Sequence, residues 1–249
     1  MIPNAGRRVM GAFGKNRNRK EQTIKMAGGT AQIITIDGPA GAGKSTVAKR
    51  LAGKLNLFYL DTGAMYRALT LKAMRRNIDL EDEGALAAMA KQTDVDLENS
   101  ASGLKVLLDG EDVSREIRSV DVTNKTFYVA RAPKVREIMV QWQRAIGNRT
   151  GVVAEGRDIG TVVFPDATVK FYLDAHVGER SRRRIEELRG KGEEVNEARL
   201  TAELKERDRK DLTRSVGPLK KAEDAICIDT TRLTVDKVVE VMLRHIKKR

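Results

Sequence analysis

Residues 38–45 are the part of the chain whose residue types and spacing are best suited to chemistry. They read Gly-Pro-Ala-Gly-Ala-Gly-Lys-Ser, between a short apolar run and a helical pattern. Glycines let a backbone curl until successive N–H groups point at phosphate oxygens, at the positive end of a helix dipole. A lysine and a hydroxyl at the end of such a loop suit β- and γ-phosphates and a phosphate-bound Mg²⁺. The pattern therefore predicts a phosphate-binding P-loop rather than a glycine-rich turn before an ordinary helix.

Arginines near two strand ends suggest a second anion beside the P-loop. Arg67 follows a short apolar run by about two helical turns, and Arg157 and Asp158 come directly after another. Ligands of open α/β sheets collect at the carboxyl ends of the strands, so we expect these side chains to face the P-loop ligand. Each arginine alone could equally be a salt-bridged surface residue, but the two together favour a site.

A third group of charges lies on two consecutive helices joined by a Gly-Lys-Gly turn. Arg180 and Arg184 share one face of the first helix, and Arg207, Asp211 and Arg214 share one face of the second. A charged helix pair can be a solvated surface. It can also be a lid that carries guanidinium groups to a transferred phosphoryl group, and this is the interpretation that we favour.

The elements that position these residues alternate between strand-like and helix-like patterns, which is typical of a parallel α/β sheet. Buried strands are expected at residues 33–36, 57–60, 151–154, 169–173 and 225–228. Helices are expected at 45–55, 62–74 (with Thr62 as N-cap), 81–90, 120–130, 133–146, 177–189, 196–212 and 235–247. Residues 95–113 instead show short apolar runs broken by turn residues, which predicts a small antiparallel insert.

Composition limits the class of protein. The chain has 249 residues, of which 41% are hydrophobic, enough for one large domain with insertions. Aromatic residues make up 4%, which argues against a surface that stacks nucleic-acid bases. No apolar run is long enough to span a membrane. Cys227, the single cysteine, lies in an apolar run, so we expect it in the core of a protein of the reducing cytoplasm.

The net charge of +12 is concentrated at the N-terminus. Seven basic residues and one acidic residue precede Met26, without a sustained apolar pattern. We therefore expect residues 1–31 to be a disordered basic extension and residues 32–249 to form the folded domain. The extension could be a weak polyanion-binding arm, but an upstream start codon, with the true start at Met26, is the interpretation that we favour.

Several motifs together resemble the bacterial cytidylate kinases, of the nucleoside monophosphate kinase group. The resemblance runs from about residue 33 to the C-terminus, and its motifs lie at 36–45 (IDGPAGAGKS), 60–67 (LDTGAMYR), 110–118 (GEDVSREIR), 155–167 (EGRDIGTVVFPDA) and 206–211 (ERDRKD). It implies an α/β P-loop kinase with a central parallel five-stranded sheet flanked by helices. It also implies an inserted antiparallel monophosphate-binding subdomain at about 90–132 and a helical lid at about 178–214.

The resemblance also implies roles for individual residues. ATP would be bound by Gly38, Pro39, Ala40, Gly41, Ala42, Gly43, Lys44, Ser45 and Thr46. CMP would be bound by Thr62, Arg67, Arg136, Arg157, Asp158, Arg207, Asp211 and Arg214. The residues expected to act on the transferred phosphoryl group are Lys44, Arg157, Arg180 and Arg184, with Arg180 and Arg184 in the lid over ATP. Ser45 would contact Mg²⁺, which ATP phosphates and water otherwise hold.

One residue departs from the family pattern. Phe127 stands where the family often has a base-contacting serine, and Thr126 is the neighbouring candidate for that contact.

The expected chemistry is transfer of the ATP γ-phosphoryl group to CMP or dCMP without a general base. A phosphate monoester has a second pKa of about 6, so its attacking oxygen is already anionic at neutral pH. Only two histidines occur, His176 and His245, and neither lies in a site motif. The partners expected are therefore ATP and CMP or dCMP, without a membrane, an obligatory protein partner or more than weak nucleic-acid binding by the basic extension.

Cytosine presents a hydrogen-bond donor at its amino group and acceptors at N3 and O2. Arg136 as a donor and Asp158 as an acceptor would match this pattern. Asp158 could instead orient Arg157, and the sequence leaves both roles open.

Other kinases of the same class remain alternatives, namely uridylate, adenylate and shikimate kinases. A switch GTPase is disfavoured because no Asn-Lys-x-Asp element is present. A nucleic-acid-binding module would rest on the basic extension alone.

Overall fold

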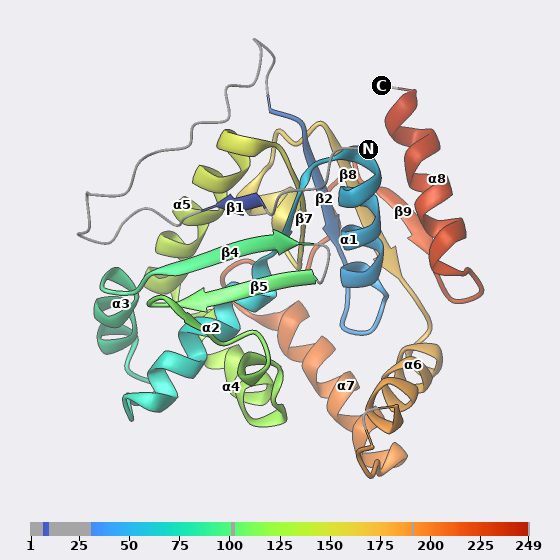
Figure 1. Ribbon diagram of the computed structural model, residues 1–249. Helices are drawn as coiled ribbons and strands as arrows, with labels where there is room; N and C mark the ends of the chain where they lie inside the picture. The colour runs from blue at the N-terminus through green and yellow to red at the C-terminus, as the bar shows by residue number, and fades with distance from the viewer. Residues whose placement is uncertain (1–6, 10–30, 101–102, 191, 249) are drawn as a thin grey trace. The chain divides into compact units, whose positions relative to one another are not determined.

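The computed structural model describes residues 7–9, 31–100, 103–190 and 192–248. The chain divides into two compact units, which we describe one at a time (Figure 1). The P-loop unit comprises Ile33–Asn56 and Val153–Arg249, and the insert unit comprises Leu57–Val152 with the described residues before Ile33. Most of the predicted basic extension lies outside the described residues, so its disorder and the expected domain bounds stay predictions.

The central sheet has the predicted five strands. They are β2 (Ile33–Asp37), β3 (Phe58–Asp61), β7 (Val152–Gly156), β8 (Val169–Asp174) and β9 (Ile226–Asp229). Their order in the sheet is β3-β7-β2-β8-β9, and β8 pairs in parallel with both β2 and β9. Every residue of β3 is buried, as are four residues of β2 and four of β7. Burial on both faces is typical of parallel strands covered by helices, and it explains their continuous apolar runs.

Among its described residues the P-loop unit contains four α-helices, and each corresponds to a predicted helix. They are α1 (Lys44–Leu55), α6 (Val177–Arg189), α7 (Glu197–Thr213) and α8 (Val235–Lys247). Helix α1 packs against α8, and α6 packs against α7 (Figure 1). The apolar side chains Val238, Val239 and Met242 form the buried stripe of α8. None of the helices in the described part of the chain is long and apolar enough to cross a membrane.

Among its described residues the insert unit contains four α-helices and an antiparallel sheet, of which the strands within residues 95–113 were predicted. The helices are α2 (Thr62–Arg75), α3 (Glu83–Lys91), α4 (Val120–Arg131) and α5 (Pro133–Thr150). The sheet has the order β1-β4-β5-β6, with bounds Arg7–Val9, Val95–Ser100, Gly103–Leu108 and Glu111–Asp112. Asp109 and Gly110 connect β5 to β6, with φ angles of 50° and 90°. Positive φ at both positions suits a tight hairpin turn, which explains the Asp-Gly pair in the sequence.

Strand β1 lies within the range predicted to be disordered. The backbone of Arg7–Val9 pairs antiparallel with β4, in the register Arg7–Asn99 to Val9–Leu97. The other residues before Ala31 lie outside the described residues.

Two local predictions were wrong. Asp61, and not Thr62, caps α2, because its carboxylate accepts a hydrogen bond from the N–H of Ala64 at 2.7 Å. Cys227 is exposed rather than in the core. Strand β9 lies at the edge of the sheet, and Ile228 is its one buried residue even though its sequence is apolar.

Candidate active site

The loop between β2 and α1 has the backbone geometry that a P-loop requires. Gly41 and Gly43 have φ angles of 79° and 87°, in the left-handed region that glycine adopts without strain. At Gly38 a Cβ atom would lie 2.0 Å from the carbonyl oxygen of Leu173 in β8, so no larger residue fits. The glycines thus let the loop pass close to β8 and turn directly into α1.

Lys44, the first residue of α1, is buried in the loop that it serves. Its side chain donates a hydrogen bond to the carbonyl oxygen of Pro39 at 2.7 Å. Burial and the nearby Arg157 lower the pKa of Lys44 to about 7, against the opposing effect of Glu155. A buried cation with a lowered pKa is stabilised by an incoming anion, which is what a phosphate-binding lysine requires.

Four residues predicted to bind CMP form ion pairs with each other in the P-loop unit. Arg157 Nε donates to Asp211 Oδ2 at 2.7 Å, and Arg214 Nη2 donates to Asp158 Oδ1 at 3.4 Å. Arg157 and Asp158 follow β7, whereas Asp211 and Arg214 lie at the end of α7. The structure therefore joins two separate sequence motifs into one charged cluster.

The electrostatics of this cluster favour the ionised form of the Asp211 carboxylate. Burial alone would raise the pKa of Asp211, but the positive charges of Arg157 and Arg207 outweigh burial and hold that pKa below its usual value. Burial by itself would lower the pKa of Arg157. The negative charge of Asp211 and its hydrogen bond act in the opposite direction, and the pKa of Arg157 is raised. Arg207 thus acts on this cluster through its charge. Asp211 therefore contacts Arg157 directly, whereas the sequence had suggested Asp158 as a carboxylate that could orient Arg157.

Of the two predicted lid arginines, Arg180 contacts the P-loop. It is buried, and its Nη1 donates to the carbonyl oxygen of Ala40 at 3.1 Å and to Asp208 Oδ2 at 2.6 Å. Its Nε donates to the carbonyl oxygen of Ala175 at 2.9 Å. Arg184, one turn later, pairs with Glu187 of its own helix at 2.7 Å. Arg180 therefore connects α6, α7 and the P-loop, whereas the described contact of Arg184 stays within α6.

The remaining CMP candidates lie in the insert unit. Thr62 is buried, and Arg67 Nη2 donates to Asp61 Oδ2 at 3.2 Å. Among the described residues, the buried Nε of Arg67 has no hydrogen-bond partner. Such a buried donor suits a ligand acceptor, because an unpaired buried N–H is costly.

Arg136 is also buried in the insert unit. Its Nη1 donates to the carbonyl oxygen of Ala130 at 3.1 Å, and its guanidinium lies 5.7 Å from the centre of the Tyr66 ring. The Thr126 hydroxyl donates to the carbonyl oxygen of Val122 at 2.7 Å. This bond leaves the hydroxyl only its acceptor capacity for a base.

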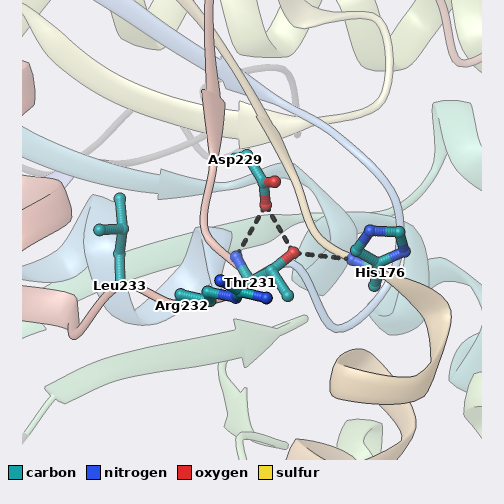
Figure 2. Close-up of a pocket in the computed structure, with 5 residues that line it drawn as sticks. All are labelled: His176, Asp229, Thr231, Arg232 and Leu233. Atoms are coloured by element: carbon teal, nitrogen blue, oxygen red, sulfur yellow. Dashed lines mark hydrogen bonds between the residues drawn. The ribbon is translucent and has the colours of Figure 1, made fainter.

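Sequence reasoning missed a pocket that lies next to the P-loop. It has a volume of about 400 Å³ and is lined by His176, Asp229, Thr231, Arg232 and Leu233 (Figure 2). Figure 2 shows that the backbone N–H of Thr231 and its hydroxyl both contact Asp229, while the N–H of His176 donates to that hydroxyl at 3.0 Å.

Thr230 connects this pocket to the P-loop. Its hydroxyl lies 3.1 Å from the carbonyl oxygen of Ala42 and accepts a hydrogen bond from Arg183 Nη1 at 3.1 Å. The signal that could have found the pocket is the polar run at 229–232, because it follows a predicted strand at the edge where ligands collect.

Two acidic residues were also missed, Asp37 and Asp208. Asp37 accepts hydrogen bonds from the N–H groups of Ile159 and Gly160, both at 2.8 Å. Asp208 pairs with Arg180. Both lie inside recognised motifs, but their partners are at least 28 residues away in the sequence, so no local pattern indicated them.

Ser45 is the predicted metal contact, and its surroundings can be compared with what a phosphate-bound ion requires. In the described part of the chain, no group of three or more His, Cys, Asp or Glu side chains could hold an ion. Ser45 is exposed at the start of α1, where its hydroxyl is accessible to a phosphate-bound ion. This donor set suits Mg²⁺, which usually keeps water and substrate phosphates as ligands.

A P-loop at the end of a central parallel strand, with a cluster of arginines and a pair of charged helices, defines a P-loop kinase. The family model described as cytidylate kinase matches residues 34–248. The chain therefore belongs to the cytidylate kinase family. The resemblance expected from the motifs is confirmed, as is the assignment to an enzyme, a nucleotide-binding kinase.

Individual relatives support this assignment over most of the chain. The cytidylate kinase of Caldanaerobacter subterraneus subsp. tengcongensis is 53% identical over 215 residues, covering 86% of this chain and 94% of that protein. The cytidylate kinase of Shewanella loihica is 48% identical over 220 residues, covering 88% and 96%.

A solved structure of an uncharacterized protein from Eubacterium ventriosum shares the fold. Its TM-score is 0.51 at 17% identity, and the match covers 88% of this chain and 99% of that chain. At this identity the likeness concerns the fold alone.

Proposed function

We propose that the protein transfers the γ-phosphoryl group of ATP directly to CMP or dCMP, giving CDP or dCDP. Membership of the cytidylate kinase family supports phosphorylation of CMP by ATP. The observation that carries the mechanism is the charged cluster around Lys44, in which Arg157 is held by Asp211 and Arg214 by Asp158. Such a cluster suits a reaction between two polyanions, because the main obstacle is their mutual repulsion.

The proposed transfer uses no protein general base. The attacking oxygen of a phosphate monoester is already anionic at neutral pH, since its second pKa is about 6. Asp37, whose pKa burial raises to about 6, accepts two backbone hydrogen bonds, and we propose a structural role for it rather than that of a general base. His176 lines the pocket beside the P-loop, and the proposed transfer gives it no role as a general base.

The residues have distinct proposed tasks in the transfer. Lys44 and the backbone N–H groups of residues 38–46 bind the ATP phosphates, and Arg157, Arg180 and Arg184 neutralise the charge of the transferred group. Ser45 would contact a phosphate-bound Mg²⁺, which would supply further neutralisation of phosphate charge. The helix pair α6–α7, at about 178–214, is proposed to act as a lid that excludes water, which would otherwise accept the phosphoryl group.

Cytosine recognition is proposed for Asp158, whose carboxylate can accept the amino group of the base. The partnership of Arg157 with Asp211 supports this role, since Arg157 does not depend on Asp158 alone for its orientation. We propose that Arg207, Asp211 and Arg214 also contact CMP. Thr62 and Arg67 are proposed to do so too, on the strength of their motif and, for Arg67, of its unpaired buried Nε. Arg136 is proposed as a further CMP contact on the strength of the family resemblance.

The pocket beside the P-loop is proposed to hold the base of ATP. Thr230 lies between the lining residues Asp229 and Thr231, and its hydroxyl is 3.1 Å from the carbonyl oxygen of Ala42 in the loop proposed to bind the phosphates. The pocket volume of about 400 Å³ suits a purine base with part of its ribose.

The deciding experiment is a coupled assay of ATP turnover with CMP, dCMP, UMP and AMP side by side. The expected result is much higher kcat/KM for CMP and dCMP than for UMP and AMP. Equal or higher efficiency with UMP or AMP would contradict the proposed substrate. The cytoplasmic location and the absence of an obligatory partner stay predictions.

A further inference from the structure

We propose that Asp37 is a positioning residue that fixes the segment containing Arg157 and Asp158 to the strand carrying the P-loop. This inference rests on the proposed function of that segment. It does not make Asp37 a ligand of either nucleotide.

The Asp37 carboxylate accepts one hydrogen bond from each of two neighbouring backbone N–H groups, those of Ile159 and Gly160, and we call this pair of contacts the clamp. Asp37 is the last residue of β2, directly before Gly38, and its side chain is 4% exposed. Oδ1 accepts the N–H of Ile159 at 2.8 Å, and Oδ2 accepts the N–H of Gly160 at 2.8 Å. Each carboxylate oxygen therefore holds one backbone donor.

The two donors belong to the turn that follows the charged segment. A π-helical turn, η2 (Ile159–Val163), begins directly after Asp158. The first N–H groups of a helix lack partners within it, and Asp158 makes no capping hydrogen bond of its own here. Asp37 supplies the missing acceptors from a strand that is 122 residues away in sequence. Asp158 is thereby spared from capping, and its carboxylate pairs with Arg214.

Close packing shows that the contact is specific. A Cβ atom at Gly160 would lie 3.3 Å from Asp37 Oδ2 and 2.9 Å from Thr35 Oγ1. Only glycine lets the backbone approach β2 this closely. Thr35 lies on the same face of β2 as Asp37, and its buried hydroxyl has no hydrogen-bond partner among the described residues.

The cost of this arrangement indicates that it serves more than folding. Burial disfavours the charge of Asp37 and raises its pKa to about 6, although the two N–H groups and Lys44 oppose this effect. The buried carboxylate lies between the loop that binds one substrate and the segment proposed to bind the other. Loss of the clamp should therefore affect CMP more than ATP.

The experiment compares Asp37→Asn with Thr35→Val, a matched control on the same face of the same strand. Asparagine has nearly the same size as aspartate, but its side chain has a single oxygen. Its amide NH₂ group would therefore face one of the two backbone N–H donors instead of accepting a hydrogen bond from it. For Asp37→Asn we expect KM for CMP to rise about tenfold or more while KM for ATP changes less than about threefold, the effect of one charge-assisted hydrogen bond. Thr35→Val should keep wild-type constants, because it removes no hydrogen bond.

Hydrogen exchange tests the clamp without relying on activity. Backbone amides in a peptide covering residues 157–163 should exchange faster in Asp37→Asn than in wild type or Thr35→Val. Unchanged exchange, or CMP and ATP constants that shift equally, would overturn the inference.

If Asp37→Asn does not fold, Gly160→Ala provides the same test from the other side of the contact, with the same readouts. If the wild-type enzyme does not phosphorylate CMP, the proposed function is contradicted. Hydrogen exchange of residues 157–163 would still decide whether Asp37 holds that segment.

Discussion

The inner and outer faces of helix α6 show how differently two arginines can be used. Arg180 on the inner face is 7% exposed and contacts a P-loop carbonyl and Asp208 of α7. Arg182, two residues later, has a side chain that is 57% exposed and pairs with Glu179 and Glu186 of its own helix. The residue type is the same, but one arginine joins three elements and the other joins none.

The difference lies in where the carboxylate partner comes from. An ion pair within one exposed helix surface is screened by water and contributes little. A buried arginine with partners on other elements is held in one orientation, and it leaves unpaired groups behind when it is removed. Buried arginines with distant partners are therefore the ones that we expect to matter for catalysis.

The largest effect is expected for Lys44→Ala, at the centre of the inner region. This substitution removes the cation of the P-loop but little core packing, so kcat should fall by about three orders of magnitude with the fold intact. Steady-state kinetics with a thermal unfolding control would measure this. Activity close to wild type would refute the P-loop assignment.

Arg180→Gln should come next, with a loss of kcat of about a hundredfold. Its removal leaves the carbonyl of Ala40 and Asp208 without their guanidinium, so the melting temperature should also fall. Kinetics and calorimetry on the same preparation would separate the two effects. An active, stable variant would show that the inner face is no more important than the outer one.

Asp158→Asn tests base recognition inside the charged cluster. If the carboxylate accepts the cytosine amino group, its loss should lower kcat/KM for CMP by roughly 10- to 100-fold, equivalent to about 1.5–3 kcal/mol. The CMP/UMP ratio should fall as well, since an amide N–H can donate to the uracil carbonyl. A constant ratio, with both substrates equally impaired, would instead indicate that Asp158 only orients its neighbours.

A buried charge also differs from an exposed one in its response to pH. The pKa of Asp37 is about 6 in the folded protein, against an ordinary value of 3.8, with Asp158 and Lys44 as charged neighbours. At Asp37 the folded state therefore binds more protons than the unfolded state between these values, so the contribution of this group to stability falls as the pH rises through about 4 to 6. The two-unit difference corresponds to at most about 3 kcal/mol.

Asp37→Asn cannot titrate, so its free energy of unfolding should lack this decline. Urea denaturation of both proteins between pH 4 and 7.5 would measure the difference. Parallel pH profiles would contradict the raised pKa.

The smallest effect is expected for Arg182→Gln, on the outer face. Its partners lie on the same exposed helix, so kcat and both KM values should stay within about twofold of wild type. The same assay as for Arg180→Gln makes the comparison direct. A loss approaching that of Arg180→Gln would break the distinction between the two faces.

Much of the fold could be predicted because its signals are local. The apolar runs of β2, β7 and β8 and the periodic pattern of α8 correspond to the observed elements within a few residues. The P-loop was equally readable, since glycine at positions 38, 41 and 43 reflects a backbone that no other residue adopts easily. The motifs carried the family assignment, which the comparisons confirmed.

The pairing of charges could not be predicted in the same way. The sequence shows Arg157, Asp158, Asp211 and Arg214 as candidates, but not that Arg157 pairs with Asp211 and Arg214 with Asp158. The partners are 54 and 56 residues apart, and only the packing of α7 against its own unit brings them together.

The sequence by itself thus determined the backbone path of the P-loop and the kinds of charge available, because conformational preference and hydrophobic period act over a few residues. Tertiary structure alone decided that Asp37 caps η2, that Arg180 reaches the P-loop while Arg182 faces water, and that Cys227 is exposed. Burial and partner choice depend on segments that are distant in the chain, and burial sets the strength of every charge interaction in the site.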